Sequence, residues 1–138
     1  MNWSEVVNHI GDAWLAHIAT ADGSGAPHVA VVAPAIEGEV VWILTGRSAR
    51  KTKNLGVNPR MALMWAPRAE IYVHGTVEVV DDVNEKRRIW SSGLLSFDPA
   101  GFFGTPENPE LVLLKVTPQA ASVMAQGPDG LARHRWHR

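Results

Sequence analysis

The chain has 138 residues, of which 46% are hydrophobic and 20% are charged, and it carries a formal net charge of -1. This length and composition predict one folded domain and exclude a disordered chain. The balanced charge provides no long-range field to attract nucleic acid or an anionic membrane, and the absence of cysteine excludes disulfides and thiolate metal sites.

The first part of the chain predicts a short helix followed by strands. Asn2 or Ser4 can cap the helix, Gly11 marks its end or a kink, and Trp14 follows the helical period of the apolar positions. The first five residues have neither a basic start nor an apolar run, so no secretion signal is expected and the cytoplasm is the expected location. Apolar and β-branched runs then predict strands at residues 15–20, 29–32 and 40–44.

The rest of the chain combines further strands with short helices. A helix at residues 51–55 must end before Asn58, because the residue before a proline avoids the α region. Residues 71–79 alternate apolar and polar side chains, which is the period of a strand with one buried face. Asp82 caps another helix. Two more strands are predicted at residues 61–65 and 111–116.

Residues 94–110 form a long connection that is rich in Gly, Pro and Phe. A long connection of this kind covers an apolar surface or a binding site. Its three aromatic side chains, together with Trp90, therefore either wall a pocket or pack over the opening of a barrel. These three are Phe97, Phe102 and Phe103.

The predicted fold class is mainly β with short helices, in the form of a six-stranded antiparallel barrel. A closed or nearly closed barrel is favoured because closure removes the exposed edges that a small open sheet would have to protect. We assign residues 1–126 to this single domain. Residues 127–138 are expected to form a polar, mobile C-terminal tail.

The segment from Thr45 to Lys51 carries the clearest chemistry. A predicted strand ends at Thr45, a loop containing Gly46 follows, and a helix then begins. The N–H groups of a helix N-terminus, the Ser48 hydroxyl and the cations Arg50 and Lys51 suit a phosphate. The alternative is a solvated basic turn, since the spacing is not that of a standard phosphate loop.

Several short motifs follow one another in a fixed order along the chain. They are Gly25-Ala26-Pro27-His28-Val29, Trp42-Ile43-Leu44-Thr45, Ser48-Ala49-Arg50-Lys51-Thr52-Lys53-Asn54-Leu55, Asn58-Pro59-Arg60 and Tyr72-Val73-His74-Gly75-Thr76. Their order and spacing resemble those of the pyridoxamine 5'-phosphate oxidase-like superfamily. Residues 108–118 resemble the last-strand segment of its general stress protein type.

The resemblance implies an FMN-binding split β-barrel that forms a homodimer, with two equivalent cofactor sites at the subunit interface. Arg50 and Lys51 fall where the family holds the FMN phosphate, with Thr45 close to the same group. Main-chain groups of residues 28–31 are expected along the polar edge of the isoalloxazine ring, and Glu70 near the flavin of the other subunit. The expected cofactor-binding residues are His28, Val29, Ala30, Val31, Thr45, Ser48, Arg50, Lys51 and Glu70.

Two segments depart from the family's patterns. Residues 132–138 do not match the C-terminal Arg and His motif with which pyridoxamine phosphate oxidases hold their substrate, which argues against vitamin B6 oxidation. Residues 122–124 are Ser, Val and Met, where stress-protein relatives commonly carry a Tyr-Trp pair. An aromatic contact with the cofactor is therefore expected to be missing.

The leading functional hypothesis is a dimeric FMN flavoprotein of the oxidoreductase type, with a small-molecule substrate or a nicotinamide as partner and no identified catalytic side chain. Residues 51–60 are also similar to the deazaflavin-dependent branch, in which Arg47, Lys53 and Arg60 would accommodate the anionic tail of the deazaflavin coenzyme F-420. A flavin-binding stress protein without turnover is a third interpretation. The histidines show no metal-ligand spacing, so no metal site is expected.

Overall fold

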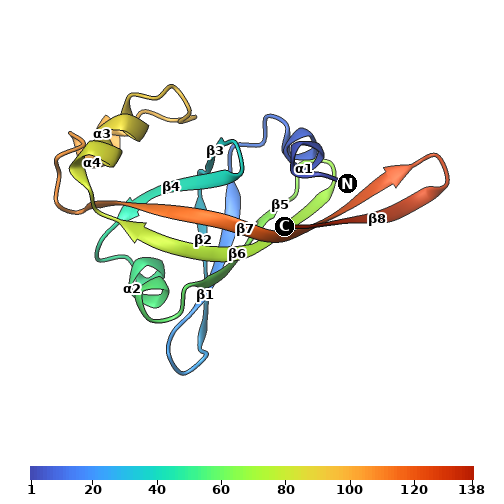
Figure 1. Ribbon diagram of the computed structural model, residues 1–138, viewed down its shortest axis with the longest axis horizontal. Helices are drawn as coiled ribbons and strands as arrows, with labels where there is room; N and C mark the ends of the chain where they lie inside the picture. Colours follow the sequence, from blue (N-terminus) through green and yellow to red (C-terminus); the bar gives the residue numbers. More distant parts are fainter.

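Eight strands form one antiparallel sheet in the computed structural model, which describes residues 1–138. The strands are β1 Ala16–Ala21, β2 Pro27–Val32, β3 Ala35–Glu37, β4 Val40–Gly46, β5 Arg60–Trp65, β6 Glu70–Val80, β7 Leu111–Gly127 and β8 Gly130–His137. Their order along the sheet is β2-β1-β5-β6-β7-β4-β3, and β8 pairs with β7. Only Ala33 and Pro34 separate β2 from β3, which lie at opposite ends of this order, so the sheet curls until the end of β2 comes close to the start of β3 (Figure 1). The two strands do not pair with each other.

Four short helices accompany the sheet: α1 Trp3–Ile10, α2 Arg50–Val57, α3 Val83–Trp90 and α4 Ala100–Phe103. A reciprocal pair of hydrogen bonds caps α1, because the Asn2 side chain accepts from the Glu5 N–H while the Glu5 carboxylate accepts from the Asn2 N–H. α2 packs against β1, where the Asn54 amide donates to the buried Thr20 hydroxyl at 3.1 Å. None of the helices has the length and apolar character needed to cross a membrane.

The cap of α1 yields a stability prediction. Asn2→Ala is expected to lower the free energy of unfolding by about 1 kcal/mol, because the first turn of α1 loses its side-chain acceptor. Urea denaturation measures the change. Asn2→Ser should retain most of the stability because serine is also a good N-cap. Equal midpoints for Asn2→Ala and wild type would contradict the capping role.

The apolar interior divides into two clusters. The larger one fills the barrel, and its fully buried members include Ile18, Ile43, Leu63, Ile71 and Val73 from four of the strands. The smaller one joins α3 to β3, β4 and β7, and we call it the α3 cluster. Its four buried members are Ala35, Trp42, Ile89 and Leu113. The barrel and α3 are therefore stabilised by separate sets of contacts.

The predicted fold class, a mainly β split barrel, is confirmed, although the sheet has eight strands instead of six. The two additional strands are the short β3 and the C-terminal β8. β8 lies in the segment expected to be a mobile tail, but it pairs with β7 along its length. Trp136 of β8 is buried against Trp3, with ring centroids 5.2 Å apart, and this contact explains why the segment is ordered.

Candidate cofactor site

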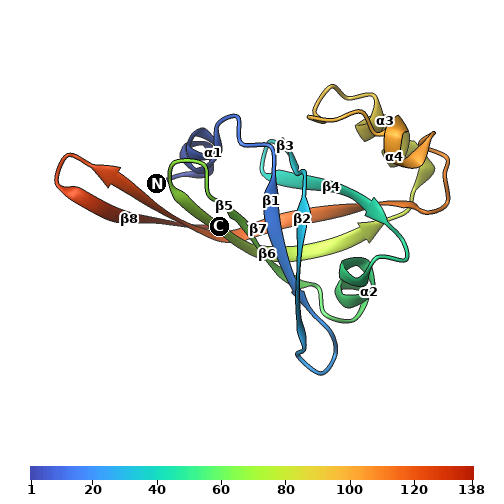
Figure 2. The same ribbon diagram turned by 180° about the vertical axis from the view of Figure 1, so that it is seen from behind.

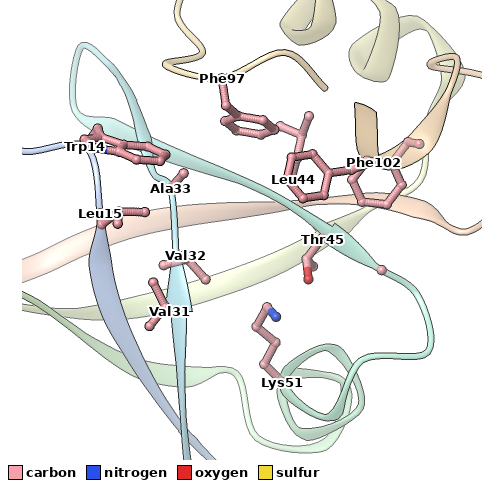
Figure 3. A pocket seen from close by; sticks show the side chains of 12 residues that line it. Trp14, Leu15, Val31, Val32, Ala33, Leu44, Thr45, Lys51, Phe97 and Phe102 are labelled. Carbon is pink, nitrogen blue, oxygen red and sulfur yellow. The ribbon is translucent and has the colours of Figure 1, made fainter. Parts of the chain in front are cut away.

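A cavity of about 450 Å³ opens where β2, β4 and α2 meet the connection between α3 and β7. Figures 1 and 2 both show the end of β4 between α2 on one side and the α3–α4 region on the other. Thr45 and Lys51 form the polar end of the cavity, and aromatic side chains including Phe97 and Phe102 form the opposite wall (Figure 3). The cavity therefore has one end that carries a cation and one apolar wall.

The local fold explains why Thr45 and Lys51 lie together. β4 ends at Gly46, and α2 begins after a short loop. The Thr52 hydroxyl donates to the Gly46 carbonyl at 2.7 Å, which ties the first turn of α2 to the end of the strand. Ala49 at the N-cap provides no side-chain cap, and the first turn contains no acidic residue. The first N–H groups of α2 therefore remain free to donate to an anion.

Lys51 is the only cationic residue that lines this cavity. Its side chain is half-buried, and this burial lowers the pKa of the ammonium group. It forms no ion pair, in contrast to Arg47 and Lys86, which both pair with Asp81. Because partial desolvation of an unpaired charge is unfavourable, an anion in the cavity would offset that cost. The polar end of the cavity therefore fits the phosphate of a flavin cofactor.

Two neighbouring groups of the loop have protein partners instead. Arg47 donates from Nη2 to Asp81 at 2.5 Å and from Nε to the Pro109 carbonyl at 2.9 Å. Ser48 donates to the Glu110 carboxylate from its N–H at 2.8 Å and also from its hydroxyl. These two bonds are the main reason why the pKa of Glu110 lies below its ordinary value. Arg47 and Ser48 therefore stabilise the loop and do not line the cavity.

Asp81 connects this loop to α3. Its carboxylate accepts from Arg47 and also pairs at 2.7 Å with Nζ of Lys86, whose side chain is buried. The bond from Arg47, followed by that from Lys86, lowers the pKa of Asp81 below its ordinary value of 3.8. A carboxyl whose pKa is depressed by folding stabilises the protein above its unfolded pKa, and this stabilisation is lost as the pH falls through the folded pKa. The ion pairs of Asp81 therefore stabilise the fold above about pH 4.

Asp81→Asn is expected to lower the free energy of unfolding at neutral pH by about 1 kcal/mol, a value kept small because the carboxylate is half-exposed. The variant should then lose less additional stability than wild type between about pH 4 and pH 2. Thermal melts across this range measure both effects. Parallel pH profiles for the two proteins would show that Asp81 does not contribute to the acid sensitivity.

The structure brings together three of the residues expected to bind the cofactor, since Val31, Thr45 and Lys51 all line the cavity. Arg50 is the exposed first residue of α2, and its side chain does not line the cavity. The expected residues outside the cavity are His28, Val29, Ala30, Ser48, Arg50 and Glu70.

Two of these outlying residues have distinct surroundings. His28 lies on β2 opposite Thr20, and its Nδ1 atom is buried without a hydrogen-bond partner. Such orphaned polar atoms are rare in folded proteins, so His28 retains capacity for a bond that the chain itself does not supply. Glu70 begins β6 and accepts a hydrogen bond from the Tyr72 hydroxyl at 2.9 Å. Neither residue lines the cavity that contains Lys51 of the same chain.

The aromatic wall is only partly indicated by the sequence. Phe97, Phe102 and Phe103 line the cavity and Trp90 does not, which favours the pocket interpretation for the first three. Trp14 also lines the cavity, although the helical period predicts it on a helix face. α1 ends at Ile10, and Trp14 lies in the loop before β1. The glycine that follows Ile10 is the feature of the sequence that indicates the end of the helix at this point.

A protein-family model described as pyridoxamine 5'-phosphate oxidase matches residues 4–125 of the chain. The chain belongs to this family. The matched range includes every residue that lines the cavity, from Trp14 to Phe103. No curated protein matches the sequence.

Solved structures of other proteins show the same fold. General stress protein 26 from Bacillus anthracis str. Sterne is 20% identical with a TM-score of 0.74, and the match covers 96% of this chain and 97% of that chain. A pyridoxamine 5'-phosphate oxidase-related, FMN binding protein from Nostoc punctiforme PCC 73102 is 14% identical with a TM-score of 0.73, and the match covers 97% of this chain and 86% of that chain. An F420 reductase is 27% identical with a TM-score of 0.58, and the match covers 79% of this chain and 89% of that chain.

Proposed function

We propose that the protein binds FMN in this cavity and acts as a flavin-dependent oxidoreductase on a small molecule or a nicotinamide. The observation that carries the proposal is the unpaired, half-buried Lys51 ammonium beside Thr45 and the uncapped first turn of α2. A phosphate at this point would receive charge-assisted hydrogen bonds. The bound cofactor would supply the hydride or electron transfer. The FMN-binding protein of the same fold from Nostoc supports this choice of cofactor.

The free edge of β2 supports the expected position of the flavin ring. β2 lies at one end of the sheet and pairs only with β1. The N–H and C=O groups along its other edge therefore have no strand partner. We propose that residues 28–31 use these groups to orient the polar edge of the isoalloxazine ring, as the family resemblance implies.

We also propose that two copies of the chain assemble as a homodimer. Val29 and Val31 of β2 are 64% and 59% exposed, and the register places them beside Ala19 and His17, which are exposed on the same face of β1. The exposed side chains of Val29, Val31 and Ala19 give this face an apolar character of the kind that marks an interaction site. In the dimer, Glu70 would approach the cofactor site of the partner subunit. Sedimentation of the purified protein measures the assembly, and a monomer at micromolar concentration would contradict it.

Titration of the purified protein with FMN tests the proposed cofactor. We expect saturable binding at micromolar concentration or below, followed by the visible spectrum and by flavin fluorescence. Oxidation of NADH or NADPH by the FMN-loaded protein, measured with a panel of acceptors, then separates an oxidoreductase from a flavin-binding stress protein without turnover. A protein that fails to bind FMN below high micromolar concentrations would contradict the proposal.

A deazaflavin-dependent reductase is the second candidate, favoured by the 27% identity with the F420 reductase. Lys53 and Arg60 are exposed and form no ion pair, so they are free to bind an anionic tail, whereas Arg47 is paired with Asp81. Titration with coenzyme F-420 in parallel with FMN separates the two candidates. Tighter binding of F-420 would favour the reductase.

A further inference from the structure

The apolar side of the cavity is built by side chains from two distant segments of the chain. Trp14 comes from the loop before β1, whereas Phe97, Phe102 and Phe103 come from the connection after α3. We call these four residues the aromatic wall. Phe97 and Phe102 pack edge to face, with ring centroids 5.6 Å apart and planes at 85° (Figure 3). This pair orders the wall in the absence of any ligand.

The aromatic wall contributes little to the core of the barrel. Phe102 is 75% exposed and Trp14 is 49% exposed, and neither packs in the barrel cluster or in the α3 cluster. Removing large aromatic side chains from water is strongly favourable. The rings of Phe102 and Trp14 line a cavity and are nevertheless exposed to solvent. Their apolar surface therefore points to a ligand that would cover it.

The two sides of the cavity differ in hydrogen-bonding capacity. On one side, β2 lines the cavity with Val31 and Val32, and the main-chain N–H and C=O groups on its edge away from β1 have no strand partner. On the other side, the three phenylalanines of the aromatic wall have side chains without any hydrogen-bonding group. The isoalloxazine ring of FMN has the same asymmetry, with a polar pyrimidine edge and an apolar dimethylbenzene edge. Burying the polar edge against phenylalanine rings would leave its groups unpaired, which is costly. The dimethylbenzene edge is therefore the one that suits the wall.

We propose that the aromatic wall binds the dimethylbenzene edge of the flavin and thereby selects FMN over an 8-hydroxy-deazaflavin. The proposal rests on the proposed FMN function. The deazaflavin of coenzyme F-420 carries a hydroxyl where the flavin carries a methyl group. If this hydroxyl were placed against Phe102 and Phe103, it would lose its hydrogen bonds to water and gain no hydrogen-bond partner in the protein.

Two probes without a phosphate isolate the ring from the Lys51 end of the cavity: riboflavin and 8-hydroxy-5-deazariboflavin. Wild type is expected to bind riboflavin about 10- to 100-fold more tightly, the range in which an apolar pocket rejects an added hydroxyl. Phe102→Ala should weaken riboflavin and FMN by the same factor of roughly 10, as expected for loss of one aromatic contact with a planar ring. The variant should discriminate less between the two probes. Flavin fluorescence measures all these affinities.

Val57→Ala is the matched control. Val57 is a similarly exposed apolar residue, 68% exposed on α2, but it does not line the cavity. Its replacement should leave every affinity unchanged. Phe102 packs in neither apolar cluster, and its replacement removes only the edge-to-face contact with Phe97. Phe102→Ala should therefore have a melting temperature close to that of wild type, and this comparison shows that the fold is retained.

The outcomes separate this proposal from the proposed function. If wild type binds FMN but Phe102→Ala binds it equally well, the aromatic wall does not hold the ring and the proposal is overturned. Equal affinity of wild type for the two phosphate-free probes overturns the assignment of the ring edges. If wild type binds neither FMN nor riboflavin, the proposed function itself fails.

Discussion

Replacing Lys51 with alanine is expected to weaken FMN binding about 10- to 100-fold, the effect of losing one hydrogen bond to a charged phosphate. Lys51 is the only cation that lines the cavity, and no carboxylate of the chain neutralises it. The remaining donors, the N–H groups of the first turn of α2, are neutral. They should retain part of the affinity, because their hydrogen bonds to a charged phosphate are also charge-assisted. Titration with FMN by flavin fluorescence measures the loss.

Two comparisons give this prediction its specificity. Riboflavin lacks the phosphate, so its affinity should be the same for Lys51→Ala and wild type. Lys53→Ala removes a neighbouring exposed cation that does not line the cavity, and it should change FMN affinity only slightly. If Lys51→Ala binds FMN as tightly as wild type, the phosphate does not lie at this end of the cavity.

Gly75→Ala is expected to lower the free energy of unfolding by about 3 kcal/mol, at the upper end of the usual cost of overpacking. Gly75 lies in β6 where the register with β7 shifts. A Cβ at this position would lie 2.3 Å from the Thr117 carbonyl oxygen and 3.1 Å from Cα of Pro118. Both contacts are with backbone, so the two central strands would have to separate. Urea denaturation measures the loss as a lower midpoint.

Gly56→Ala is the appropriate control for this substitution. Gly56 lies in α2, where no atom outside the neighbouring helix backbone lies within 4 Å of an added Cβ. Alanine is the better helix former, so this variant should be neutral or more stable by up to about 1 kcal/mol. A Gly75→Ala protein as stable as wild type would mean that β7 moves aside at little cost.

The parts of the fold that could be predicted are those with a local pattern. Residues 71–79 alternate strictly, and Ile71, Val73 and Val77 of β6 are indeed buried. β8 has no such pattern, because most of its side chains are exposed and only Trp136 is buried. Its order depends on pairing with β7 and on the contact with Trp3 at the other end of the sequence. Contacts between such distant residues leave no local signal.

The same distinction applies to the candidate site. Thr45 and Lys51 are close in sequence, on either side of one loop, and the motif predicts their proximity to each other. The partners of Arg47 and Ser48 lie far along the chain, so a motif cannot show that Asp81 and Glu110 already occupy these groups. A basic loop in the sequence therefore suggests more donors for a ligand than remain free in the structure.

The α3 cluster has a consequence for how the protein moves. The apolar cluster that holds α3 against the sheet has only four buried residues, whereas the barrel cluster has twenty, and the connection that follows α3 bears three of the four aromatic-wall residues. Local opening requires only the contacts of the unit that opens to be broken. Amide hydrogens of α3 and the following connection should therefore exchange with solvent through small, frequent openings, while those of β6 exchange only when the barrel itself unfolds. The cavity could thus admit and release a ligand without any loss of the sheet.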